Sequence, residues 1–186
     1  MQREVGFLDD VRRRMAILSD KRKKLGTNPI FSHRVQELDG FRIGFMHPKM
    51  FQKLCRTHGL DPANCEAILM QADCQTEPHV HAAGRSVFLP LGPEEGFASC
   101  DGGTFVGPYH AGERRFALAF APAEPGKSFV IDPGVIHFFT PGRGKEFSAI
   151  AFVSPRIQRD DGSFDITRFG KPTITERGAE VLVEVA

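Results

Sequence analysis

The stretch PHVHAAGRSVFLPLG, residues 78–92, places two histidines one residue apart just before a run of apolar side chains. Side chains of an extended strand alternate between its two faces, so His79 and His81 share a face, with their Cα atoms about 6–7 Å apart. This separation suits two imidazoles that bind the same cation. A lone His-x-His pair is common, so it indicates a metal site only where a neighbouring strand brings a third ligand.

A third histidine follows a tight turn later in the chain. The stretch GKSFVIDPGVIHFFTPG, residues 126–142, contains the sequence DPG. Proline sets φ and glycine adopts a backbone conformation that other residues resist, so these residues predict a turn. His137 then begins the next expected strand and is the candidate third ligand.

The overall composition excludes several classes of protein. The chain has 186 residues, of which 41% are hydrophobic and 25% charged, as is usual for one soluble domain with its own core. A net charge of +1 argues against a dedicated nucleic-acid-binding protein. No apolar run reaches the roughly 18 residues of a membrane span, and the charged N-terminus does not resemble a signal peptide. The four cysteines lack CxxC spacing. We therefore expect a cytoplasmic protein with no nucleic-acid or membrane partner.

The sequence changes character near residue 65. Before this point, the spacing of apolar residues predicts a helix over residues 5–25 and a second over 48–57, which Gly59 ends. A short strand is expected between them, over 41–46. After residue 65, short apolar runs are separated by glycine and proline, as is typical of an all-β sandwich or barrel. These runs cover residues 67–72, 86–91, 104–106, 115–121, 127–131, 136–140 and 147–153.

Two of the expected strands are apolar on both faces. In RRFALAFAP (114–122) and EFSAIAFVS (146–154), alanines on one face alternate with larger apolar residues on the other. Both faces therefore need cover. The alanine face has room to line a barrel, and the other face needs the N-terminal helices or a second subunit. We expect a homodimer for this reason, although the helices alone could suffice.

The histidines and their surroundings resemble the two motifs of the cupin superfamily. The first motif, G(x)5HxH(x)3,4E(x)6G, matches at His79, His81 and Gly92, and the second, G(x)5PxG(x)2H(x)3N, matches at Gly126, Gly134 and His137. Four positions depart from the motifs: Asp73 replaces the first glycine, Arg85 the glutamate, Asp132 the proline and Pro141 the asparagine. The resemblance covers about residues 66–153.

The resemblance implies a mainly β fold, a double-stranded β-helix or jelly-roll barrel with N-terminal helices. It implies one domain overall, with a helical extension over residues 1–64 packed on a barrel over 65–157, and a tail or edge strand over 158–186. The three motif histidines would hold one divalent metal ion. Some cupins, such as cysteine dioxygenase, hold non-haem iron with three histidines, which makes Fe(II) our first choice, with Ni, Zn, Mn or Cu as alternatives. A cupin that has lost its metal is the competing interpretation.

The activity that this resemblance implies is that of a non-haem iron dioxygenase acting on a small organic acid, thiol or diketone. The alternatives are a metal-dependent isomerase or lyase, and a small-molecule-binding protein without enzymatic activity. Tyr109 and His110, in an expected loop, are further candidates for catalytic acid, base or orienting groups.

Arg85 has two expected placements. If the strand stays regular after His81, counting in steps of two turns Arg85 inward, where it would bind the carboxylate or phosphate of an anionic substrate. A turn at residues 82–84 would instead put Arg85 on the surface. Its partner there would be Glu77, Glu94 or Glu95.

Overall fold

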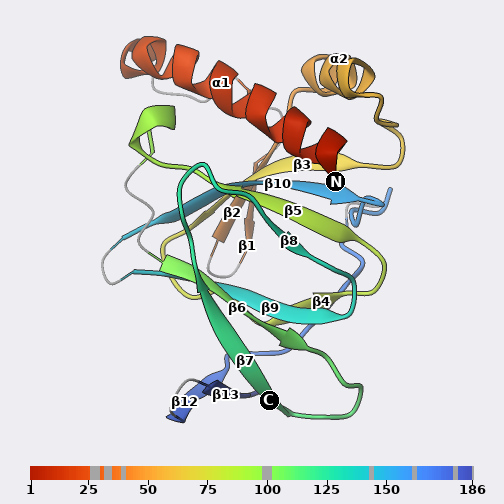
Figure 1. The fold of residues 1–186 in the computed structure, drawn as a ribbon, viewed down its shortest axis with the longest axis vertical. Coiled ribbons are helices and arrows are strands. Elements are labelled where there is room, and N and C mark those ends of the chain that lie inside the picture. Colours follow the sequence, from red (N-terminus) through yellow and green to blue (C-terminus); the bar gives the residue numbers. More distant parts are fainter. Residues whose placement is uncertain are drawn as a thin grey trace.

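Most of the chain folds into two antiparallel β-sheets that face each other (Figure 1). The computed structural model describes residues 1–25, 30–31, 35–38, 41–97, 102–142, 145–160, 163–177 and 180–185. The first sheet contains, in order, β1 (Val35–Leu38), β2 (Phe41–Phe45), β3 (Glu66–Ala72), β10 (Phe147–Ser154), β5 (Arg85–Pro90) and β8 (Phe129–Ile131). The second contains β11 (Ile166–Arg168), β4 (His79–His81), β9 (Val135–Pro141), β6 (Gly102–Pro108), β7 (Arg115–Pro122), β13 (Glu180–Glu184) and β12 (Thr173–Arg177).

The strand pairs from β3 to β10 are nested. β6 pairs with β7, β5 with β8, β4 with β9 and β3 with β10, and consecutive strands mostly alternate between the sheets. A long hairpin rolled up in this way is a jelly roll, or double-stranded β-helix. The predicted fold class is therefore confirmed, and all seven apolar runs expected after residue 65 form strands.

Both predicted helices are present and cover the outside of the first sheet (Figure 1). α1 (Gln2–Leu25) buries Phe7 completely, and its ring centroid lies 5.0 Å from that of Phe152 on β10. α2 (Pro48–His58) begins with a proline and ends at Gly59, whose φ of 63° is left-handed. Neither helix in the described part of the chain combines the length and apolar character needed to cross a membrane.

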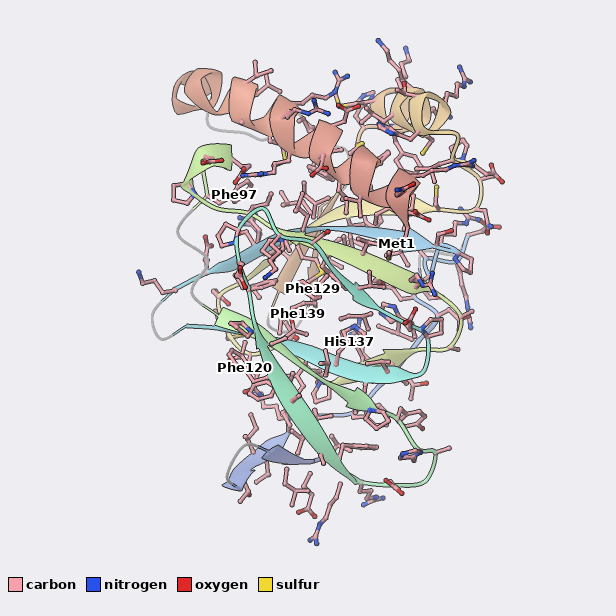
Figure 2. The ribbon with its side chains drawn as sticks, viewed as in Figure 1. Met1, Phe97, Phe120, Phe129, His137 and Phe139 are labelled. Carbon is pink, nitrogen blue, oxygen red and sulfur yellow. The ribbon has the colours of Figure 1, made fainter. Side chains whose placement is uncertain are left out.

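β10 has the two covered faces that its sequence predicts. Ile150 and Phe152 pack against α1 on the outer face. Ala149 and Ala151 face the space between the sheets, where they join the core around Phe139. Figure 2 shows Phe129, Phe139 and His137 in this space. The helices of the same chain therefore cover β10, and this strand does not need a second subunit.

For β7, the expectation that both faces are covered is wrong. Phe116 and Leu118 are buried on the outer face of the second sheet, but Phe120 on the same face is 46% exposed. The alanines of the opposite face are exposed: Ala117, Ala119 and Ala121. β7 lies between β6 and β13 in the second sheet. The homodimer stays a prediction.

The C-terminal stretch, expected to be a tail or edge strand, contributes to the second sheet in two places. β12 and β13 form a hairpin, and β13 pairs with β7. β11, which precedes this hairpin in the sequence, pairs with β4 at the opposite edge of the second sheet. β1, β11 and β12 have no counterpart among the strands expected from the sequence, and β11 is the one that reaches the histidines.

Candidate metal centre

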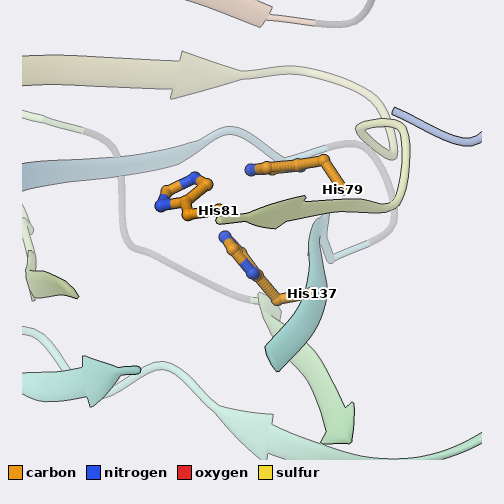
Figure 3. Close-up of side chains that lie close together, drawn as sticks. All are labelled: His79, His81 and His137. Atoms are coloured by element: carbon orange, nitrogen blue, oxygen red, sulfur yellow. The ribbon is translucent and has the colours of Figure 1, made fainter. Parts of the chain in front are cut away.

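The structure brings together the three histidines that the sequence singles out (Figure 3). His79 and His81 lie on β4, and His137 on β9 is paired with His79 across the two strands. The imidazole centroids are 5.3 Å apart for His79 and His81, 4.2 Å for His79 and His137, and 4.9 Å for His81 and His137. One nitrogen from each ring lies within 4.8 Å of the others, so the three side chains form a group that could hold a metal ion.

Hydrogen bonds orient each imidazole from its Nδ1 side. Nδ1 of His79 lies 3.0 Å from the carbonyl oxygen of Glu77, and Nδ1 of His137 lies 3.0 Å from that of Val135. A carbonyl oxygen only accepts, so Nδ1 carries the proton in both rings and Nε2 keeps a lone pair. Nδ1 of His81 lies 3.2 Å from the buried hydroxyl of Ser86. Bonds of this kind orient and polarise histidines that ligate metals.

The Nε2 atom of His137 is the strongest sign of a missing partner. His137 is completely buried, and its Nε2 has no hydrogen-bond partner among the described residues. Burying a polar atom without a partner is costly, and native proteins rarely leave one so. A metal ion beside Nε2 would accept the lone pair. The residues present therefore fit a metal bound by three imidazoles.

Burial keeps the imidazoles neutral. It lowers the pKa of His79 to about 3, with smaller contributions from His81 and from the guanidinium of Arg168. Burial lowers the pKa of His81 to about 4. The pKa of His137 is also well below its ordinary value, first because of burial and then because of the two neighbouring rings. At neutral pH no proton competes with a metal ion for these lone pairs.

His79 and His81 line a small apolar cavity between the two sheets, and His137 lies behind them. The cavity volume is about 40 Å³, which is room for a few water-sized groups. The polar residues that line it are His79, His81, Thr76, Ser86 and Arg168. The apolar lining comes from both sheets and from the segment after β10: Ile43, Ile68, Met70, Phe88, Phe139, Ala151, Val153, Ile157, Phe164 and Ile166.

Arg85 lies on the surface, away from this cavity. Its side chain is 54% exposed, and its Nε lies 2.6 Å from Oδ1 of Asp132, rather than beside any of the three glutamates expected as partners. β4 ends at His81, and β5 begins at Arg85 in the other sheet. Because a turn separates the two strands, the alternation of side chains along β4 does not continue to Arg85. On β5, Ser86 and Phe88 are the residues that face the histidines.

Tyr109 and His110 do not line the cavity. Tyr109 packs in an aromatic cluster on the outer face of the second sheet, with its ring centroid 5.9 Å from Phe116 and 5.5 Å from Phe169. His110 is exposed in the loop that follows. The structure thus gives neither residue a contact with the three histidines.

Arg168 is the cavity residue that sequence reasoning missed. It lies on β11, directly opposite His79 on β4. Its position outside both motifs, in a strand of three residues, left no periodic pattern that would have pointed to it. The sequence offered one weak signal, the spacing of two between Ile166 and Arg168, which puts both on the same face of a strand.

Comparisons with known proteins give matches among solved structures only. No family model matches this sequence. No curated protein matches it either. The solved structures that match include KdgF from Halomonas sp., with 18% identity over 69% of this chain and 92% of that chain, at a TM-score of 0.43. Pac13 of Streptomyces with uridine matches with 11% identity over 76% of this chain and 90% of that chain, at a TM-score of 0.44.

A third match is longer than this chain. Oxalate decarboxylase from Lactobacillus farciminis has 10% identity over 73% of this chain, at a TM-score of 0.46, and the match spans 33% of the decarboxylase. A further match, an uncharacterised protein from Klebsiella pneumoniae with 14% identity over 59% of this chain and 77% of that chain, at a TM-score of 0.39, is described as having a double-stranded β-helix domain. The double-stranded β-helix of this chain is defined by its own nested strand pairs, and it carries a cluster of three histidines.

Proposed function

We propose that His79, His81 and His137 bind one divalent metal ion, with Fe(II) as the native metal. The observation that carries this proposal is the buried Nε2 of His137, which has no partner among the described residues. Three imidazoles satisfy only part of the coordination sphere of a transition metal, so positions stay open for a substrate. The absence of a carboxylate at position 85 does not weaken the site, because the three rings already converge without it.

The activity that we propose is that of a dioxygenase acting on a small organic substrate. An isomerase or lyase needs a base that moves a proton on the substrate. Among the described residues that line the cavity there is no carboxylate, lysine or tyrosine. Bound Fe(II) would supply the electrons for oxygen chemistry, which does not require a protein base. The apolar walls would exclude water from the substrate.

Metal content tests the site. Protein purified without chelators should contain about one metal ion per chain, and His137→Ala should contain far less. His47→Ala, which changes an exposed histidine before α2, is the matched control and should retain the metal. Equal metal content in the wild type and His137→Ala would show that the three-histidine site is wrong.

Oxygen consumption tests the activity. The iron-loaded protein should take up oxygen with at least one member of a panel of small organic acids, thiols and diketones, and His137→Ala should not. Turnover by the zinc- or nickel-loaded protein without oxygen would instead indicate an isomerase or lyase. Ligand binding that survives His79→Ala in a protein without metal would indicate a binding protein.

A further inference from the structure

The edge strand β11 places a positive charge beside the three histidines. β11 runs antiparallel to β4, with Ile166 opposite His81 and Arg168 opposite His79. Directly opposite residues of an antiparallel pair project to the same face and are neighbours. Ile166 and Arg168 line the cavity together with His79, and the side chain of Arg168 also reaches solvent.

No acidic residue neutralises this guanidinium within the described part of the chain. Arg168 has no ion pair or side-chain hydrogen bond there. The carboxylate nearest in sequence, Asp165, is engaged by Arg159, whose Nη2 lies 2.7 Å from its Oδ1. Arg168 differs in this respect from Arg159, Arg156 and Arg85, which all have carboxylate partners.

The charges around the cavity call for an anion. Three neutral imidazoles leave a divalent metal ion with its full charge, and Arg168 adds another positive charge beside it. No acidic residue is among the described residues that line the cavity. An anionic group between the metal and Arg168 would remove the repulsion between the two cations.

We infer that Arg168 binds the carboxylate of the substrate, and that the substrate is a short organic acid with an apolar body. This inference rests on the proposed metal site for the second contact of the substrate. The planar guanidinium offers two parallel donors that match the two oxygens of a carboxylate. The remaining walls are almost entirely apolar, and the cavity of about 40 Å³ admits only a short chain. Arg168 thus takes the role that position 85 would have had if it faced inward.

Calorimetric titration of the zinc-loaded protein with butyrate tests this assignment. Butyramide, which has the same shape without the charge, is the matched ligand. We expect butyrate to bind at least about tenfold more tightly than butyramide, and Arg168→Gln to weaken butyrate by about tenfold or more with unchanged zinc content. Arg168→Lys should retain part of the affinity. Arg85→Gln, which removes a surface guanidinium paired with Asp132, should bind butyrate like the wild type.

Three results would overturn the inference. The first is an Arg168→Gln variant that keeps its zinc and binds butyrate as tightly as the wild type. The second is equal affinity of the wild type for butyramide and butyrate, and the third is tighter binding of methyl phosphate than of butyrate. Failure of the metal site is a separate result, seen as a wild type that takes up no zinc. In that case butyrate is titrated into the metal-free protein. Binding that Arg168→Gln abolishes would then support the role of Arg168, and binding that it leaves unchanged would refute it.

Discussion

Ser86 holds one of the three imidazoles in place although it would not touch the metal. Its hydroxyl is completely buried and lies 3.2 Å from Nδ1 of His81. Removing such a partner usually lowers metal affinity by about 10- to 100-fold, because the ring loses its fixed orientation. We expect Ser86→Ala to bind zinc at least about tenfold more weakly in competition with a chromophoric chelator. Ser148→Ala, at a buried serine of β10, should bind zinc like the wild type. Equal affinities for all three proteins would contradict this role.

The lowered pKa values of the histidines predict how the metal-free protein responds to acid. In the unfolded chain a histidine has a pKa near 6.5, whereas burial lowers the pKa of His81 in the folded chain to about 4. Between these values the unfolded chain binds a proton that the folded chain does not, so the free energy of unfolding falls as the pH falls. Each such histidine contributes up to about 1.4 kcal/mol per pH unit.

Urea unfolding of the metal-free protein at pH 7 and pH 5 measures this effect. The wild type should lose stability over this interval, and His81→Asn should lose about 1 kcal/mol less per pH unit. Carboxylates such as Glu66, whose pKa burial raises, titrate in both proteins and cancel in the comparison. An identical pH dependence in the two proteins would mean that His81 is not held neutral by the fold.

At the scale of single residues, the sequence predicts the histidines but not the charges around them. His79 and His81 are two residues apart on one strand, and the turn between β8 and β9 places His137 at the start of another. Both features can be read from short stretches of sequence. Whether Arg85 faces the cavity or the surface depends on where β4 ends. The three small residues 82–84 allow either a continued strand or a turn, so the sequence does not decide. The position of Arg168 depends on the pairing of β11 with β4, a contact between segments more than 80 residues apart that no local pattern encodes.

Helix α1 is attached to the barrel by an ion pair as well as by its apolar face. Nε of Arg12 lies 2.6 Å from Oε1 of Glu95, a carboxylate only 1% exposed in the short helix η1 (Pro93–Glu95). The other oxygen of Glu95 accepts a hydrogen bond from the backbone N–H of Gly92. Removing the guanidinium takes this countercharge from a buried carboxylate, which is destabilising.

Arg12→Met should therefore lower the free energy of unfolding by about 2–3 kcal/mol, less than for a fully buried pair because Arg12 is 30% exposed. Arg13→Met is the neighbouring control. Its side chain is 73% exposed, so we expect a loss below about 0.5 kcal/mol. Denaturation by urea measures both changes. A loss in Arg12→Met as small as that in Arg13→Met would show that the pair does not hold α1 to the barrel.

Elements with a strong pattern are the ones that sequence reasoning finds. Both helices and the seven apolar runs form regular structure, and β10 is covered on both faces as its residues require. The same reasoning fails for β7. Whether its alanines are covered depends on which other parts of the chain pack against the strand, and the strand's own residues do not specify this. β1, β11 and β12 are three to five residues long, too short to show a period.

For the molecule as a whole, the apolar contacts are numerous enough to hold the fold without a metal. One core lies under α1, a second lies between the sheets and a third lies on the outer face of the second sheet. The ring centroid of His137 lies 6.3 Å from Phe88 and 6.1 Å from Phe139, so the histidines border the second core. The proposed metal should therefore stabilise the folded protein without being required for folding, unlike the metal of a very small domain.

A metal ion that binds only the folded chain adds about 4 kcal/mol when its concentration is a thousand times its Kd. For a domain of this size, 1 kcal/mol corresponds to about 2–4 °C in Tm. We expect EDTA to lower the Tm of the zinc-loaded protein by about 10 °C and to leave its far-ultraviolet circular dichroism at 25 °C unchanged. His137→Ala should show no change in Tm with EDTA. Unfolding of the wild type by EDTA at 25 °C would mean that the three cores do not suffice, and an unchanged Tm would mean that the histidines do not hold a metal in the folded barrel.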